Sequence, residues 1–216
     1  MPLRNNAINY LNNIVNIGET DIYEFGINHG HSFYKINEYL LKNNIKPNKI
    51  WGFDSFVGLP KEKGGLKIIS TWEEGCFNVK KEMGVNTTEE VIQNILKNNN
   101  TNIECEFVAG FYKDVLIDDI IKKKSLKKAS FIDIDVDLYQ STIEVFEFFI
   151  QNDLFNDIVI INFDDWGGLP EYSGGESLAF KEMVEKYNLN ATEIFTTGVN
   201  WVGGVNHVQK VFKIIK

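Results

Sequence analysis

The spacing of apolar and polar residues predicts a chain that alternates between strands and helices. Apolar positions at helical spacing predict an N-terminal helix over residues 7–15. Residues 21–25 and 49–53 are typical of short strands, and the first ends in a glycine turn. Between them, residues 33–41 show helical spacing, and Ser32 can cap that helix. Strand, turn, helix and strand form a βαβ unit, which implies a parallel sheet.

The same alternation continues to the end of the chain. Further strands are predicted at residues 103–108, 129–135, 157–163, 191–197 and 208–215, and further helices at 88–98, 115–121, 142–150 and 176–187. The short link at 198–206 favours a hairpin between the last two strands. We therefore expect a doubly wound, Rossmann-like α/β fold. Its seven-stranded sheet is mostly parallel, with an antiparallel C-terminal hairpin and a reversed strand at the edge.

Residues 57–87 interrupt this alternation. Glycines and a proline punctuate the segment, and Trp72, Phe77 and Met83 lie between them. A long excursion between sheet elements is more often functional than idle. We therefore expect a wall or lid over a binding site, within a single domain that spans residues 1–216.

Composition narrows the class of protein without identifying it. The 216 residues are 44% hydrophobic and 24% charged, as in ordinary globular proteins, and the net charge of -8 offers no electrostatic footprint for nucleic acid or anionic membranes. Cys76 and Cys105 lack metal-ligand spacing and suit free thiols in a reducing compartment. Neither a signal peptide nor a run of about 18 apolar residues is visible. We expect a soluble, cytoplasmic protein that binds neither nucleic acid nor membranes.

The strongest chemical signal is a group of aspartates at the ends of the fourth and fifth predicted strands. Asp133, Asp135 and Asp137 alternate, so in an extended strand their side chains share one face. Asp164 and Asp165 follow the next strand. If the strands are neighbours, a hard divalent cation such as Mg²⁺ relieves the repulsion between these charges. Asp133 lies further inside its strand, which favours a structural, hydrogen-bonded role. Asp137 can stand outside the metal and accept a proton from a bound hydroxyl.

The ends of the first three strands carry weaker signals for a nucleoside ligand. The turn from Gly26 to Gly30 lacks the middle glycine of a dinucleotide motif, which suits a ligand without phosphates better than NAD. Asp54 can accept hydrogen bonds from ribose hydroxyls, and Gly110 followed by Phe111 suits an adenine slot. Each feature alone is equally compatible with a tight turn, a capping residue or a packed aromatic ring.

Together these segments resemble the macrocin O-methyltransferase (TylF-type) family. The matching stretches are residues 23–26 with Gly30 and Ser32, 52–60, Trp72 with Gly75 and Phe77, 110–111, 133–142, 164–165 and 175–180. The resemblance runs from about residue 20 to the end of the chain. It implies a class I methyltransferase fold, S-adenosyl-L-methionine as the methyl donor, and Mg²⁺-assisted methylation of a hydroxyl group, typically on a sugar of a natural product.

The resemblance also implies roles for the matching residues. Asp137 would be the catalytic general base. Metal ligands would be Asp135, Asp164 and Asp165. The cofactor-binding residues would be Glu24, Gly26, Gly30, Ser32, Asp54, Ser55, Gly110, Phe111 and Asp135. The family's longer N-terminal segment has little counterpart here, which leaves the closure of the site and the acceptor open. Members of the family often assemble, so a homo-oligomer is compatible with the resemblance.

Two other functions stay open on the sequence. One is an NAD-dependent sugar oxidoreductase, against which the missing middle glycine and the carboxylate cluster argue. The other is a non-catalytic nucleoside- and metal-binding module, against which the presence of Asp137 beside the metal set argues. Residues whose roles the sequence leaves open are His29, His31, His207, Trp166 and Trp201.

Overall fold

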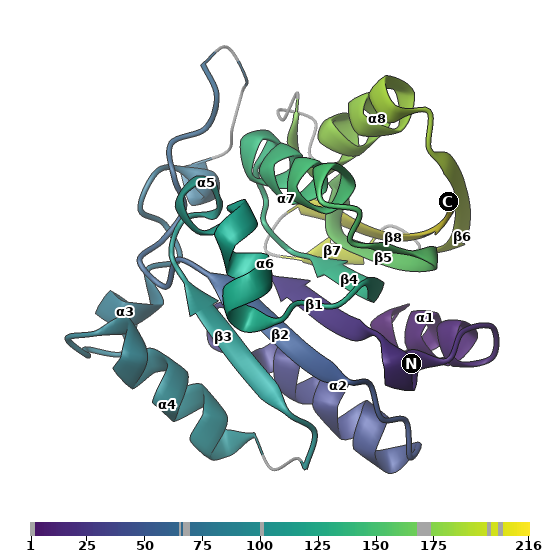
Figure 1. The fold of residues 1–216 in the computed structure, drawn as a ribbon. Coiled ribbons are helices and arrows are strands. Elements are labelled where there is room, and N and C mark those ends of the chain that lie inside the picture. The colour runs from purple at the N-terminus through teal and green to yellow at the C-terminus, as the bar shows by residue number, and fades with distance from the viewer. Residues whose placement is uncertain are drawn as a thin grey trace.

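A mixed β-sheet with helices on both faces forms the centre of the molecule in the computed structural model (Figure 1). The structure describes residues 3–64, 66, 70–99, 102–167, 174–197, 200–202 and 205–216, the side chains at 200–202 and 205–207 excepted. Its strands are β1 (Asp21–Phe25), β2 (Lys49–Asp54), β3 (Cys105–Ala109), β4 (Ala129–Ile134), β5 (Phe155–Gly167), β6 (Asn190–Thr196), β7 (Asn200–Val202) and β8 (Val205–Ile215). Its α-helices are α1 (Leu3–Asn12), α2 (His31–Lys42), α3 (Val79–Glu82), α4 (Thr88–Asn98), α5 (Tyr112–Val115), α6 (Asp118–Lys124), α7 (Tyr139–Gln151) and α8 (Gly175–Tyr187), and Ile17–Glu19 and Ser70–Trp72 form 3₁₀ turns.

The strand order is β3-β2-β1-β4-β5-β8-β6, with the short β7 paired to β8. Strands β1 to β5 are parallel to one another, and β8 runs antiparallel to both β5 and β6. This confirms the doubly wound α/β fold, its seven main strands and its antiparallel end. The expected reversed strand at the edge is wrong, because β8 inserts between β5 and β6 and leaves β6 at the edge.

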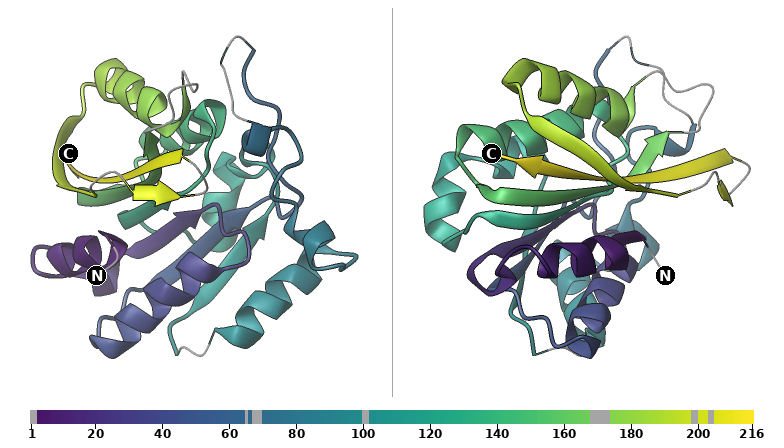
Figure 2. Two further views of the ribbon diagram at one scale, coloured as in Figure 1. Left: turned by 180° about the vertical axis from the view of Figure 1, so that it is seen from behind. Right: turned by 90° about the vertical axis from the view of Figure 1, so that its right-hand side faces the viewer.

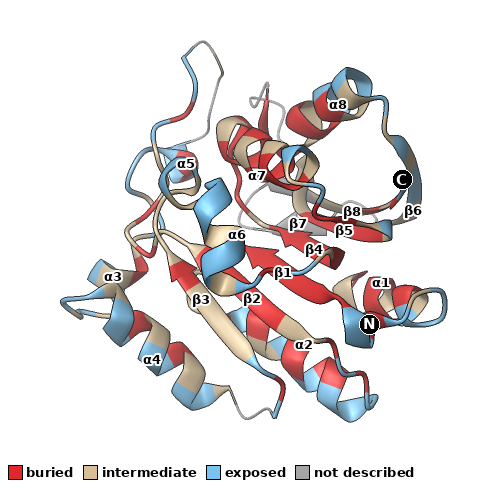
Figure 3. Cartoon of the chain, in the orientation of Figure 1, coloured by how far each residue is buried: buried red, intermediate tan, exposed pale blue. Residues whose placement is uncertain are grey.

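Helices α1, α2 and α4 cover one face of the sheet, and α6, α7 and α8 cover the other (Figure 2). Each face has its own apolar core, with Ile8 and Phe33 in the first and Phe149 and Phe180 in the second. Every residue of β4 is buried, as expected for a central parallel strand with helices on both sides (Figure 3). The sheet is therefore a rigid support for the loops at its carboxyl ends.

Two local expectations are wrong. The predicted helix at residues 115–121 is divided into α5 and α6, because Ile117 takes an extended conformation between them. Ser32 does not cap α2: Gly30 occupies the N-cap position with φ 82°, and the Ser32 hydroxyl instead donates a hydrogen bond to Oε1 of Glu24. Among the described residues, no helix has the length and apolar character needed to cross a membrane.

Candidate active site

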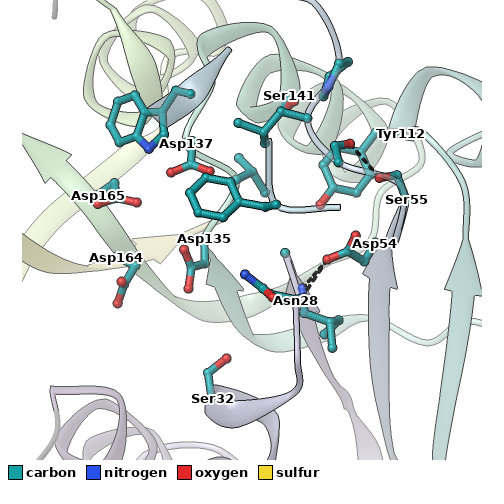
Figure 4. Close-up of a pocket in the computed structure, with 18 of the residues that line it drawn as sticks. Asn28, Ser32, Asp54, Ser55, Tyr112, Asp135, Asp137, Ser141, Asp164 and Asp165 are labelled. Carbon is teal, nitrogen blue, oxygen red and sulfur yellow. Dashed lines mark hydrogen bonds between the residues drawn. The ribbon is translucent and has the colours of Figure 1, made fainter. Parts of the chain in front are cut away.

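A cavity of about 980 Å³ lies beside the carboxyl ends of the central strands. This is where ligands bind in doubly wound sheets, and the volume is at the upper end for small-molecule sites. Figure 4 shows four aspartates on one side of the cavity and Asp54, Ser55 and Tyr112 on the other, with Asn28 between them. The cavity therefore has an acidic end and an end formed by the β2 and β3 loops.

The turn after β1 joins these two ends. Gly26 has φ 83°, and a Cβ atom on it would lie 1.7 Å from the carbonyl oxygen of Asp135. The Gly26 amide donates to Phe53 O at 3.0 Å, and the Asp135 amide donates to Phe25 O at 3.0 Å. Only glycine permits this approach, because the left-handed backbone and the contact with Asp135 both exclude a side chain.

Asp54 and Ser55, the residues expected at the ribose, both line the cavity. Asp54 Oδ2 accepts hydrogen bonds from the amides of Ile27 and Asn28, each at 2.8 Å, and Oδ1 accepts from the amide of Phe56 at 2.6 Å. Burial raises the pKa of Asp54, and these amide donors oppose that shift. The Ser55 hydroxyl donates to Gly58 O at 2.8 Å. Both side chains therefore shape the loops of the cavity, and carboxylate oxygens can accept further hydrogen bonds.

Four more of the expected cofactor residues line the cavity, namely Gly26, Ser32, Gly110 and Phe111, and Asp135 does so at its acidic end. Glu24 and Gly30 are not among the described residues that line it. Glu24 is fully buried behind Ser32, and burial, followed by the charge of Asp133, raises the pKa of Glu24 to about 8. Glu24 therefore does not contact the cavity directly, but it holds the hydroxyl group of Ser32, which lines the cavity.

Polar atoms in this region suit a polar ligand. Asn28 lines the cavity, and its buried Oδ1 has no hydrogen-bond partner among the described residues. A Cβ atom at Gly110 would lie 2.5 Å from Val115 Cγ1, so the β3 loop also requires glycine. The acceptor Asn28 Oδ1, unpaired among the described residues, could therefore accept a hydrogen bond from an amino or hydroxyl group of a nucleoside cofactor.

The acidic end combines the loop after β4 with the carboxyl end of β5. The two strands pair in parallel, with Ile134 opposite Phe163, which confirms the predicted convergence of the aspartates. One oxygen from each of Asp135, Asp164 and Asp165 lies within 4.8 Å of the others. This spacing, with half-buried oxygen donors, suits a divalent cation.

The expected alternation of three aspartates along one strand is wrong. Strand β4 ends at Ile134, so only Asp133 belongs to it, and Asp135 and Asp137 lie in the following loop. Asp137 has φ 60°, an uncommon backbone conformation for a residue with a side chain. Conversely, β5 extends to Gly167 and includes Asp164 and Asp165. The loop after β4, rather than pleating along that strand, therefore brings Asp135 and Asp137 to the aspartates of β5.

Unbalanced negative charge marks this end of the cavity. Burial, followed by the charge of Asp164, raises the pKa of Asp135 well above its ordinary range. Burial, followed by the charge of Asp165, does the same to the pKa of Asp137, which also hydrogen-bonds to Asp165. The fold therefore holds these carboxylates where their charged forms are disfavoured without a cation.

An arginine that the sequence analysis missed reaches this cluster from α1. The Arg4 Nε group donates to Asp133, while Nη2 lies 3.2 Å from Asp135 Oδ2 and 2.9 Å from Asp164 Oδ1. Asp133 also accepts from Asn162 Nδ2 at 2.6 Å, which agrees with its predicted structural, hydrogen-bonded role. One signal was available, because Arg4 is the single arginine among the 22 lysine and arginine residues of the chain.

Glu176, at the start of α8, was also missed. Its carboxylate is fully buried and accepts hydrogen bonds from the amide of Val136 at 2.9 Å and from the amide of Asp165 at 3.1 Å. Glu176 thus connects the loop after β4 to the carboxyl end of β5. Glu176 lies in a stretch that matches the family, but nothing in the sequence indicated this contact.

The segment at residues 57–87 contributes a wall of the cavity through Trp72 and Phe77, among others. Glu62 anchors it, because its buried carboxylate accepts from the amides of Tyr139 at 2.7 Å and Gln140 at 3.2 Å at the start of α7. A carboxylate at this helix end also interacts favourably with the helix dipole. The anchor connects the segment to the helix that follows Asp137.

The residues with open roles divide into three groups. His29 and His31 line the cavity, and His29 Nε2 lies 2.8 Å from Glu82 Oε2. Trp166 packs against Phe180 and other rings of the apolar core. The side chains of His207 and Trp201 lie outside the described residues.

The strand order and the cavity beyond the strands define a class I, S-adenosylmethionine-dependent methyltransferase fold. Similar solved structures are the O-methyltransferase NovP (16% identity, 98% of this chain and 80% of that one, TM-score 0.66) and the calicheamicin methyltransferase CalS11 (18% identity, 95% and 77%, TM-score 0.61). An O-methyltransferase from Bacillus cereus, in complex with S-adenosylhomocysteine, is 16% identical over 100% and 82%, with a TM-score of 0.53.

The particular family follows from the sequence. Residues 5–202 match the family described as macrocin-O-methyltransferase (TylF), and the chain belongs to that family. It is an S-adenosylmethionine-dependent O-methyltransferase. No curated protein sequence matches the chain. Family membership decides against both the NAD-dependent oxidoreductase and the non-catalytic module.

Proposed function

We propose that this enzyme methylates a hydroxyl group of a sugar, and that a divalent cation, Mg²⁺, assists the reaction. The observation that carries the proposal is the group of carboxylate oxygens from Asp135, Asp164 and Asp165, within 4.8 Å of one another in the cavity that also contains the cofactor loops. Such a group of carboxylate oxygens suits a hard cation, which prefers oxygen ligands. The three aspartates would hold the ion.

S-adenosylmethionine would supply the methyl group from its sulfonium centre. Gly26 and Ser32 would line its methionine end, with Glu24 and Gly30 behind them, and Asp54 and Ser55 would accept and donate hydrogen bonds at the ribose. Gly110 and Phe111 would form the adenine slot, and Asp135 would stand where cofactor and metal meet. Asn28 Oδ1, a buried acceptor in want of a donor, adds a contact that the sequence did not suggest.

A bound Mg²⁺ would lower the pKa of the acceptor hydroxyl and hold its oxygen in place. Asp137 would accept the hydroxyl proton. It lies beside Asp165 in the cavity, where burial and the charge of Asp165 raise its pKa. A cation held by the neighbouring aspartates would oppose that shift and favour the charged carboxylate that can accept a proton. Most of the remaining contribution of the chain would be the positioning of acceptor and donor in line.

A sugar acceptor is supported by a structural neighbour. One structure of CalS11 is described as a TDP-rhamnose 3'-O-methyltransferase. The cavity of about 980 Å³ is large enough for a cofactor and a small acceptor together. Residues 57–87, with Trp72 and Phe77, would cover the acceptor as a wall or lid.

The test measures formation of S-adenosylhomocysteine with a panel of nucleotide-linked and free deoxysugars. We expect turnover with at least one sugar, its loss in excess EDTA and its recovery when Mg²⁺ is restored. Full turnover in EDTA would exclude the metal. Methylation of aromatic diols but of no sugar would exclude the acceptor class and leave the metal role intact.

A further inference from the structure

The one arginine of the chain occupies an unusual position. Its guanidinium group reaches three separate carboxylates, those of Asp133, Asp135 and Asp164. The guanidinium group presents five N–H donors in a planar fork, so Nε and Nη2 contact different carboxylates. Burial disfavours the charge of Arg4, but Asp133, Asp164 and Asp135 together hold its pKa above the ordinary value. Arg4 therefore stays cationic within the acidic end of the cavity.

Two of the same carboxylates belong to the proposed metal site. Nη2 of Arg4 is 3.2 Å from Asp135 Oδ2 and 2.9 Å from Asp164 Oδ1, and both residues belong to the proposed ligand set. Mg²⁺ lies about 2.1 Å from its oxygen ligands, so an ion that used either of these oxygens would be no more than roughly 5 Å from the guanidinium nitrogen. Two cations at that distance in a partly buried site repel strongly.

We propose that Arg4 is a resident counter-ion that a divalent cation displaces from Asp135 and Asp164, so that Arg4 sets the affinity of the metal site. The inference rests on the metal in the proposed function. Displacement is local, because Arg4 lies in the first turn of α1, while Ala7, Ile8 and Leu11 anchor the helix in the core. The buried carboxylate of Asp133 remains as a partner for the guanidinium group.

Competition must act in both directions. If Arg4 weakens metal binding, then metal binding weakens the contacts of Arg4 by the same factor. Leu3, Arg4 and Asn5 line the cavity. Filling the metal site would therefore loosen the first turn of α1 at the cavity wall.

The experiment is a calorimetric titration of Mn²⁺, at constant pH and with S-adenosylhomocysteine present, into the wild type and Arg4→Gln. We expect the dissociation constant to fall at least about tenfold in Arg4→Gln, because a positive charge next to the ion is removed. Lys35→Gln is the matched control: it removes the same charge from an exposed side chain that lines the same cavity. Solvent screens this exposed lysine, so we expect less than about a twofold change.

Arg4→Gln leaves Asp133 buried without its cationic partner, which can prevent folding. The double variant Arg4→Gln/Asp133→Asn replaces both charges with neutral groups. Its affinity for Mn²⁺ should still rise, because the competitor of the metal is removed, but by less than in Arg4→Gln, because the negative charge of Asp133 is removed as well. Hydrogen exchange provides a second readout in the wild type. Mn²⁺ should accelerate exchange of the amides of Ala7 and Ile8, which bond to the carbonyls of the first turn of α1, but not of the amides in Thr88–Asn98 on the same face of the sheet.

Each outcome decides the proposal. Tighter Mn²⁺ binding by both Arg4 variants supports it. Equal or weaker binding by the folded variants overturns it and leaves the metal site itself standing. Failure of Mn²⁺ to bind to the wild type and to every variant overturns both this inference and the metal role in the proposed function.

Discussion

Both ends of the same sheet hold buried or half-buried aspartates, and the two ends treat them differently. Asp21, at the amino end of β1, is fully buried and accepts hydrogen bonds from Trp51 Nε1 at 2.8 Å, Lys127 N at 2.9 Å and Asn48 Nδ2 at 2.6 Å. At the carboxyl end, Asp135 lies among other carboxylates, and its pKa is raised by burial and by Asp164. Three neutral donors satisfy the charge of Asp21, whereas Asp135 shares the single guanidinium group of Arg4 with Asp133 and Asp164. The difference separates a structural carboxylate from a functional one.

The largest expected effect is on activity at the carboxyl end. If the proposed metal site is correct, Asp135→Asn and Asp164→Asn should each lower kcat/KM by roughly 1,000-fold, because the stabilisation of several kcal/mol that a metal ion would supply is lost. The melting temperature should stay the same or rise, since each change relieves repulsion in the metal-free protein. Steady-state kinetics and thermal denaturation measure both. Near-normal turnover in either variant would remove that residue from the ligand set.

The reverse result is expected at the amino end. Asp21→Ala leaves three donors without their acceptor, at about 1 kcal/mol or more each, so the free energy of unfolding should fall by about 3 kcal/mol. Activity per folded molecule should be unchanged, because Asp21 lies away from the cavity. Urea denaturation and active-site titration separate the two quantities. A stable but inactive Asp21→Ala would contradict the comparison.

A smaller loss of function is expected for a change at Glu176, which connects the loop after β4 to the carboxyl end of β5. Glu176→Gln keeps one acceptor oxygen and turns the other position into a donor, which opposes one backbone amide. We expect metal affinity or activity to fall by about 10- to 100-fold, as for other groups that orient metal ligands. Glu182→Gln, on the same helix but bonded to Tyr139, serves as the control and should behave as wild type. Equal losses in both variants would point to general damage to α8.

The smallest expected effect is a change of stability with pH. Burial and Asp133 raise the pKa of Glu24 to about 8, against about 4.3 in the unfolded chain. The folded protein therefore holds this proton more tightly, and the associated stability is present below pH 4 and is lost as the pH rises to about 8. In metal-free protein, the melting temperature of the wild type relative to Glu24→Gln should fall between pH 5 and pH 8. A difference in melting temperature that is constant over this pH range would show that the pKa of Glu24 is not raised in the folded protein.

The sequence predicted the fold well where the periodicity was strong. The apolar run of β5 and the glycine turn after β1 identified the parallel sheet and its loops. It failed where tertiary contacts decide. The place of β8 depends on which strands it pairs with, and β4 ends at Ile134, before the left-handed backbone of Asp137, which no sequence pattern indicates. Short elements such as α5 and α6 carry too few residues for a period to be recognised.

Charge repulsion and family resemblance were sufficient to predict the aspartates of the candidate site, but not the residues that contact them. The convergence of the aspartates followed from neighbouring strand ends, and it is confirmed. Arg4 and Glu176 were not found, because each meets the cluster from more than 10 residues away in sequence and from another layer of the fold. The role of Glu24 as a direct cofactor contact stays a prediction.

The approach of Gly26 to Asp135 has a consequence for how this enzyme can change over generations. A side chain at position 26 would strike the carbonyl of Asp135, so one substitution would damage the donor pocket and the cation pocket together. A substitution at this position therefore cannot alter the donor pocket without also altering the cation pocket. Variation in acceptor preference is therefore expected elsewhere, on walls such as those formed by Trp72 and Phe77.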